Sequence, residues 1–191
     1  MYAPRVAVVV LVTGAPASGK TTIARRIARE LGLPYLGKDL IKEELFDTLG
    51  WSNREWSKRL GLASMQLLYR VATAMLDADQ SMVLEANFYA RWDTSKLQSL
   101  GQTYACQFVQ IVCRAPGPVL VERYKRRMLS GERHPGHTDP SFFDEIHARL
   151  LDEKWDALDL PGPVVNVDTT TVVDFDGLLR YVSRQVSLSP G

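Results

Sequence analysis

The chain has 191 residues, 46% of them hydrophobic and 24% charged, with a formal net charge of +1 at pH 7. This length suits one well-cored domain and is short for two, and the composition is that of an ordinary folded protein. A net charge near zero gives no general attraction to polyanions, so we expect neither a stable nucleic-acid partner nor membrane binding.

The N-terminal region begins with an apolar run that leads into a glycine-rich loop and then an amphipathic helix. Residues 6–12 are apolar and mostly β-branched, which is typical of a strand buried on both faces. Because this run ends in the loop rather than in a cleavage site, we expect no signal sequence and a cytoplasmic protein. The helix has apolar residues at helical spacing, namely Ile23, Ala24, Ile27, Ala28 and Leu31.

The loop matches the full G-x-x-x-x-G-K-[ST] pattern of a phosphate-binding loop. Gly14 and Gly19 allow backbone conformations in which successive N–H groups turn inward around a phosphate, and the following helix adds its positive end. Lys20 is expected to reach the β- and γ-phosphates, and the Thr21 hydroxyl to ligate Mg²⁺. The predicted phosphate-binding residues are Gly14, Ala15, Pro16, Ala17, Ser18, Gly19, Lys20, Thr21 and Thr22.

The rest of the chain alternates between predicted helices and strands. This alternation predicts an α/β fold with right-handed crossovers, in which a five-stranded parallel sheet is covered by helices on both faces. Functional side chains should then lie at the carboxyl ends of the strands. The later strands are predicted at 35–37, 81–85, 106–112 and 163–167, and the helices at 38 onward, 54–79, 92–100, from Pro116 or Pro118, 141–155 and 175–186.

Side-chain spacing also predicts which faces of these elements are buried. Cys106 and Cys113 lie seven positions apart in one predicted strand, so they should point to opposite faces and form no disulfide. The helix over 54–79 is expected to be a long core helix. Its predicted buried stripe is Trp56, Leu60, Ala63, Leu67, Val71, Ala74 and Ala78.

A phosphate-binding loop alone occurs in several classes of nucleotide-binding protein. The N-K-x-D segment with which a GTPase recognises its base is absent from the sequence. A motor or transporter ATPase usually has a strand that ends in Asp-Glu, whereas here the third strand ends in a lone Glu85. A compact kinase remains the most economical interpretation.

The order of elements resembles that of small P-loop kinases with an AAA-type, kinase-like domain. Asp39 follows a short second strand, Glu85 ends the third strand, and an arginine-bearing helix follows the fourth. The nearest pattern is that of the zeta-toxin, chloramphenicol phosphotransferase and polynucleotide 5′-kinase group, which phosphorylates hydroxyls. The resemblance covers nearly the whole chain in element order, although only the loop matches letter by letter. It implies a three-layer P-loop NTPase fold over residues 1–191, with an arginine-bearing lid at about 123–140.

The resemblance also implies roles on the acceptor side. Asp39 matches the aspartate that accepts the hydroxyl proton, although an aspartate at this position also suits a helix N-cap. Glu85 competes for the same role, or it holds Mg²⁺ through a water, or it pairs with a nearby arginine. Asn87, Phe88 and Arg91 follow the same strand and are expected to line the acceptor pocket.

Arginines after the fourth strand are expected to act on the nucleotide. Arg123 and Arg127 stand four apart on one helical face, and in the resembling kinases such a pair stacks on adenine or clamps the transferring phosphoryl group. Arg133 would complete this clamp when the lid closes. A solvated basic face is the alternative. Asp168 and Thr169, after the fifth strand, occupy the place where these kinases hold adenine.

The loop that carries Arg133 also contains His134, His137 and Asp139. Its H-x-x-H spacing within a glycine- and proline-rich loop lacks the rigidity of a zinc site, so we do not expect a metal there. We expect His134 and His137 to bind the acceptor or to fasten the lid, with ordinary turn chemistry as the alternative.

Together these features predict an ATP- and Mg²⁺-dependent kinase that transfers the γ-phosphoryl group to a hydroxyl of a small molecule such as a sugar, an antibiotic or a metabolite. Two other interpretations stay open. One is a polynucleotide 5′-hydroxyl kinase, which needs a groove for single-stranded backbone phosphates. The other is a regulatory ATPase module that signals to a partner without phosphorylating an acceptor.

Overall fold

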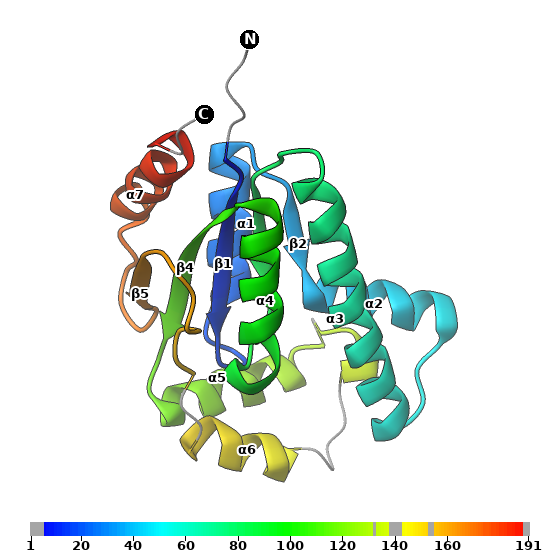
Figure 1. The fold of residues 1–191 in the computed structure, drawn as a ribbon. Helices are drawn as coiled ribbons and strands as arrows, with labels where there is room; N and C mark the ends of the chain where they lie inside the picture. Colours follow the sequence, from blue (N-terminus) through cyan, green and yellow to red (C-terminus); the bar gives the residue numbers. More distant parts are fainter. Residues whose placement is uncertain (1–5, 132, 138–142, 153–154, 189–191) are drawn as a thin grey trace.

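A parallel sheet of five strands, in the order β2-β3-β1-β4-β5, forms the centre of the computed structural model (Figure 1). The structure describes residues 6–131, 133–137, 143–152 and 155–188. The strands are β1 Val8–Gly14, β2 Tyr35–Gly37, β3 Met82–Glu85, β4 Gln107–Arg114 and β5 Val164–Asp168. The helices are α1 Lys20–Leu31, α2 Lys38–Leu49, α3 Arg54–Leu76, α4 Ala90–Tyr104, α5 Gly117–Leu129, α6 Phe143–Asp152 and α7 Phe175–Leu188, and a 3₁₀ turn, η1, spans Pro135–His137.

The sheet is covered by helices on both faces, as the alternating sequence predicted. β1 lies in the middle of the sheet and all seven of its residues are buried. Its alternate residues enter two separate cores: Val8 and Val10 pack with α1 and α7, and Val9 and Leu11 pack with α3 and α4. The apolar run therefore forms a strand buried on both faces, which begins and ends two residues later than predicted.

The two cysteines also follow the predicted alternation. Cys106, just before β4, belongs to the core under α3 and α4, whereas Cys113 belongs to the core under α1 and α7. Both are buried free thiols. Burial raises the pKa of the Cys106 thiol to about 11 and that of Cys113 to about 12, so both stay protonated and inert at neutral pH.

The predicted buried stripe of α3 is wrong beyond Leu60. Leu67 and Val71 are 42% and 38% exposed, and the helix instead buries Leu60, Ser64, Leu68, Tyr69, Ala72 and Leu76. Ser64 enters the core because its hydroxyl donates a hydrogen bond of 2.6 Å to the Leu60 carbonyl, which satisfies its polar atom within the helix. Trp56 is only partly buried, and its indole N–H donates to the Gly50 carbonyl at 2.9 Å.

The helices α5 and α6 lie across the carboxyl ends of the strands (Figure 1). Leu120 and Tyr124 of α5 pack with Ile146 and Leu150 of α6 and with Ala15 of the glycine-rich loop. Of the helix predicted over 141–155, the structure describes Phe143–Asp152 as helical, residues 141–142 and 153–154 lie outside the described residues, and Trp155 lies in an irregular segment. Among the described residues, no helix is long and apolar enough to cross a membrane.

Candidate active site

The loop between β1 and α1 has a backbone that suits an enclosed anion. Gly14 and Gly19 have φ angles of 144° and 82°, and Ala17 has a φ of 63°. A Cβ on Gly14 would lie 2.5 Å from the Cys113 carbonyl oxygen, so only glycine fits there. The Ser18 hydroxyl is buried without a hydrogen-bond partner among the residues described. This unsatisfied donor and the strained backbone fit a phosphate held by the loop.

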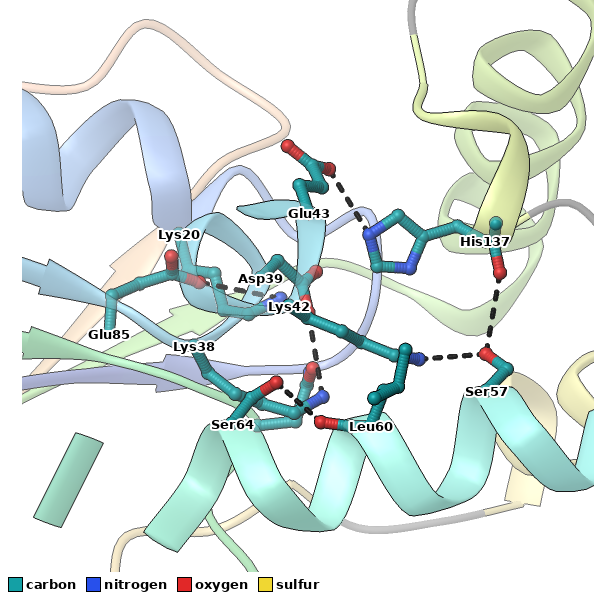
Figure 2. Close-up of polar contacts among 12 residues, drawn as sticks. Lys20, Lys38, Asp39, Lys42, Glu43, Ser57, Leu60, Ser64, Glu85 and His137 are labelled. Carbon is teal, nitrogen blue, oxygen red and sulfur yellow. Dashed lines mark hydrogen bonds and ion pairs between the residues drawn. The ribbon is translucent and has the colours of Figure 1, made fainter. Parts of the chain in front are cut away.

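Lys20 is held over this loop by two contacts. It opens α1 and is buried, and its ammonium donates to the Ala15 carbonyl at 3.3 Å and lies 3.9 Å from Glu85 Oε1 (Figure 2). Glu85 ends β3 and also accepts a 2.9 Å hydrogen bond from the Tyr35 hydroxyl. Burial and the Glu85 charge raise the pKa of Tyr35 above its usual range, so the phenol remains a donor. Glu85 thus pairs with a lysine rather than with an arginine.

Asp39 lies in the first turn of α2 and faces a cavity of about 230 Å³. Lys38 Nζ lies 3.5 Å from its Oδ1 (Figure 2). Burial raises the pKa of Asp39, but the positive charges of Lys38, Lys20 and Arg133 outweigh it and hold that pKa far below its usual range. The carboxylate is therefore ionised throughout the working range of pH.

This cavity, which we call the acceptor cavity, joins elements from both ends of the chain. It opens between the phosphate loop, α2, α3, the segment after β3, and α5 and α6. Of the predicted site residues, it brings together Lys20, Asp39, Asn87, Arg127, Arg133 and His137, beside Pro16 and Ala17 of the loop. The other described residues that line it are Lys38, Lys42, Arg54, Ser57, Lys58, Gly61, Tyr89, Tyr124, Ile146 and Arg149.

Residues 133–137, here called the lid loop, are docked on α2. The His134 Nδ1 accepts a hydrogen bond from the Gly136 amide, so its Nε2 carries the proton and donates to Asp47 at 3.0 Å. Burial and the Arg133 charge lower the pKa of His137 to about 3, so its neutral ring donates to Glu43 at 3.1 Å.

The aromatic ring of Phe46 completes this docking. It is fully buried between the two histidines, stacked on His134 at 5.0 Å and edge-on to His137 at 5.1 Å. A Cβ on Gly136 would lie 2.7 Å from the ring, so the loop backbone approaches Phe46 as closely as a glycine allows. These contacts fasten residues 133–137 to α2, and a role of the two histidines in closing a lid stays a prediction. Thr138 and Asp139 lie outside the described residues.

The predicted nucleotide-binding residues Arg123, Asp168 and Thr169 do not line the acceptor cavity. Arg123 donates to both the hydroxyl and the carbonyl of Thr169, at 3.0 and 2.6 Å, and therefore fixes the segment after β5. Asp168 accepts hydrogen bonds from the amide and hydroxyl of Thr170, which lower the pKa of this exposed carboxyl. Thr169 in turn is the nearest side chain to Gly19, so this corner borders the phosphate loop.

Residues after β3 divide between the cavity and the surface. Asn87 donates a 2.6 Å hydrogen bond to the Gly14 carbonyl and lines the cavity. Phe88 is a core residue. Arg91 stacks on the exposed Trp92 ring at 3.7 Å and does not line the acceptor cavity, so its predicted place in an acceptor pocket is not met.

Sequence reasoning overlooked the lysines of α2 and α3. Lys42 is buried, and its ammonium donates to the Ser57 hydroxyl at 2.9 Å (Figure 2). The signal was spacing: Lys42 lies one turn beyond Lys38 and three residues beyond Asp39, on the same face of α2. Lys58 belongs to the first turns of α3, which face α2.

Comparison with known proteins gives a family and a set of similar folds. A family model described as the AAA domain matches residues 9–151. Among solved structures, a candidate kinase from Chloroflexus aurantiacus J-10-fl is 40% identical with a TM-score of 0.84, over 95% of this chain and 98% of that one. Kti12 from Chaetomium thermophilum, in complex with ADP-AlF3, is 17% identical with a TM-score of 0.61, over 96% of this chain and 99% of that one. The latter likeness concerns the fold alone.

One curated relative also matches, over a short stretch. The cytidylate kinase of Pyrobaculum aerophilum is 49% identical over 51 residues, which are 27% of this chain. The match spans 28% of the length of that relative.

Proposed function

The chain belongs to the AAA domain family, and on that premise we propose that it is a P-loop kinase that transfers the γ-phosphoryl group of ATP to a hydroxyl of a small molecule. One observation carries the proposal: Lys20 of the phosphate loop and Asp39 of α2 line the same cavity. The proposed unit is one P-loop kinase domain of residues 1–191, with residues 123–140 as its lid.

On the donor side, charge and backbone amides would hold the triphosphate. The loop N–H groups and Lys20 would bind the β- and γ-phosphates, where they stabilise the negative charge that shifts during transfer. Arg127 and Arg133 line the same cavity and would complete the clamp. Arg123 would act on the nucleotide side, through the segment that it fixes at Thr169.

On the acceptor side, Asp39 would orient the nucleophile. The acceptor oxygen forms a bond to the γ-phosphorus, and the bond from that phosphorus to the β,γ-bridging oxygen breaks with its electron pair leaving on ADP. The hydroxyl proton passes to Asp39. Because neighbouring cations lower the pKa of Asp39, the carboxylate is a weak base, and its main contribution is to align the hydroxyl through a hydrogen bond before the proton moves.

The residues present also fit Mg²⁺, which typically uses one or two protein oxygens together with substrate phosphates and water. The Thr21 hydroxyl, in the first turn of α1, would ligate the ion, and the buried Glu85 carboxylate would act through a water. No group of three or more His, Cys, Asp or Glu side chains suited to a metal occurs in the described part of the chain. When bound, the ion neutralises charge on the phosphate oxygens.

A screen of ADP release over a panel of hydroxyl compounds tests this proposal. We expect at least one acceptor to raise turnover well above basal ATP hydrolysis, with a phosphomonoester as the product by ³¹P NMR. A regulatory ATPase would instead show only basal hydrolysis with every compound, together with nucleotide-dependent binding of a partner. An oligonucleotide in the panel separates small-molecule transfer from 5′-end phosphorylation.

A phosphate acceptor is the second candidate. It is favoured by the relative described as a cytidylate kinase and by the lysines that line the acceptor cavity. Cytidine monophosphate therefore belongs in the panel, because formation of a nucleoside diphosphate rather than a phosphomonoester would establish this alternative.

A further inference from the structure

The acceptor cavity holds more positive charge than transfer to a neutral compound requires. Eight of the described residues that line it are lysine or arginine, whereas Asp39 alone among them is acidic. The phosphates of ATP would account for Lys20, Arg127 and Arg133. Three lysines of α2 and α3 have no such ligand assigned: Lys38, Lys42 and Lys58.

Lys42 is the most informative of the three. Its side chain is 8% exposed, and among the residues described it forms no ion pair and one hydrogen bond, to Ser57 Oγ. That hydroxyl in turn donates to the Gly136 carbonyl at 3.3 Å, so it accepts from the ammonium. An ammonium has three donors, and a buried one that uses a single donor is costly unless a ligand takes the others.

The charges around Lys42 reinforce this point. Burial and the positive charges of Lys38, Arg133 and Arg54 lower its pKa to about 8, against the opposing charge of Asp39. The Phe46 ring lies 5.0 Å from Nζ and offers only its face. An anion bound among these cations would compensate the repulsion that the free protein retains.

We infer that the acceptor carries its own anionic group, a phosphate or a carboxylate, which binds between α2 and α3 on Lys42, Lys38 and Lys58 while the hydroxyl meets Asp39. This inference rests on the proposed function, and it narrows the acceptor from any small hydroxyl compound to an anionic one.

A second hollow has room for the rest of such a molecule. A groove of about 580 Å³ shares Lys38, Lys58, Asn87 and Tyr89 with the lining of the acceptor cavity, so the two lie side by side. The groove also has apolar walls from Leu62, Met65 and Trp92. Leu62 and Trp92 are 65% and 56% exposed.

The test compares acceptors in matched pairs that differ by one anionic group. Each pair contains a neutral polyol or sugar and its monophosphate or carboxylate, assayed for ADP release and phosphorylated product. We expect anionic members to be preferred by roughly 10- to 150-fold in kcat/KM, the range for a hydrogen bond to a charged group. The phosphate and carboxylate arms identify which anion binds.

Variants assign the preference to the lysines. Lys42→Met should remove most of it by raising KM for the anionic member alone, and Lys42→Arg should restore it. Arg59→Met removes a positive charge from the neighbouring surface of α3, where Arg59 pairs with Glu55 at 2.6 Å. This control should leave the preference for the anionic acceptor unchanged. Lys58→Met, at an exposed position, serves if Lys42→Met does not fold.

A binding experiment separates this inference from the transfer proposal. In protein saturated with ADP and aluminium fluoride, which fill the donor side, calorimetry should detect inorganic phosphate in the wild type and not in Lys42→Met. Phosphate binding without transfer to any acceptor would overturn the transfer proposal and leave the anion site. The anion site would be overturned if the wild type had the same kcat/KM for the neutral and anionic members of a pair. It would also be overturned if Lys42→Met lowered kcat/KM equally for both members.

Discussion

The donor and acceptor sides of the cavity are built in different ways. The donor side comes from one contiguous loop, residues 14–21, whose shape is fixed by backbone conformation at Gly14 and Gly19. The acceptor side is assembled from the consecutive helices α2 and α3 and from the lid loop, which lies far along the chain from them and meets them through side chains such as His137 and Ser57. A backbone-built site tolerates few substitutions, whereas a side-chain-built one can change its ligand by exchanging single residues.

Removing Lys20 should have the largest effect. In Lys20→Ala the cation that meets the transferring charge is lost, and we expect kcat to fall by roughly 10³-fold. Steady-state ADP release measures this, with Arg29→Ala as the control because Arg29 lies on the exposed side of α1 beside Glu30. Retained transfer in Lys20→Ala would contradict the assignment of the donor side.

Removing the negative charge of Asp39 should have the next largest effect. We expect Asp39→Asn to lower kcat by roughly 100-fold and to leave the affinity for ATP within about twofold, because Asp39 contacts the acceptor. Glu44→Gln, at an exposed position of α2, is the matched control. If Asp39→Asn transferred as fast as the wild type, the role of base would return to Glu85.

Alkaline pH should weaken the acceptor side alone. The pKa of Lys42 is about 8 in the free protein, and an anion would raise it, so its contribution to binding is complete below pH 8 and is lost as the pH rises through the raised value. We expect KM for an anionic acceptor to rise up to roughly fivefold between pH 8 and pH 9. KM for ATP should stay constant, and Lys42→Arg should flatten the profile. If KM for ATP and KM for the anionic acceptor rose together, the pH effect would not be confined to the acceptor side.

Displacing the lid loop should have the smallest effect of the four. In Gly136→Ala the new methyl group meets the Phe46 ring at 2.7 Å, so the loop must move away from α2. We expect kcat/KM for the acceptor to fall by about threefold to tenfold, since the overpacking strain is of the order of 1 kcal/mol. Limited proteolysis should detect the displaced loop. Leu129→Ala, at an 81% exposed position, is the control and should change neither measurement.

The difference between the two sides also explains what the sequence could predict. The phosphate loop and the five-stranded sheet follow from local patterns, because eight consecutive residues and the alternation of apolar runs define them. For Lys42 the spacing after Lys38 and Asp39 was only a weak signal, since a lysine within an amphipathic helix is usually solvated and only the packing of α3 buries it. The stripe of α3 failed for a related reason: a serine that bonds its own helix can replace an apolar residue in the core.

Arg91 shows where position in the sequence misleads. It follows a strand whose carboxyl end borders the site, and the sequence predicts it in the acceptor pocket on that ground. In the structure its guanidinium instead stacks on the neighbouring Trp92 ring, because a long side chain is directed by its nearest partner rather than by its place in the sequence.

The docked lid loop bears on the order in which two substrates bind. The Ser57 hydroxyl of α3 accepts a hydrogen bond from Lys42 and donates one to the Gly136 carbonyl, so it connects the lid loop to α2 and α3 at the acceptor cavity. No phosphate-loop residue lines the groove along Leu62 and Trp92, so an acceptor that entered there would not pass the site of ATP. The proposed reaction should then show random-order kinetics, with a dead-end complex of ADP and acceptor.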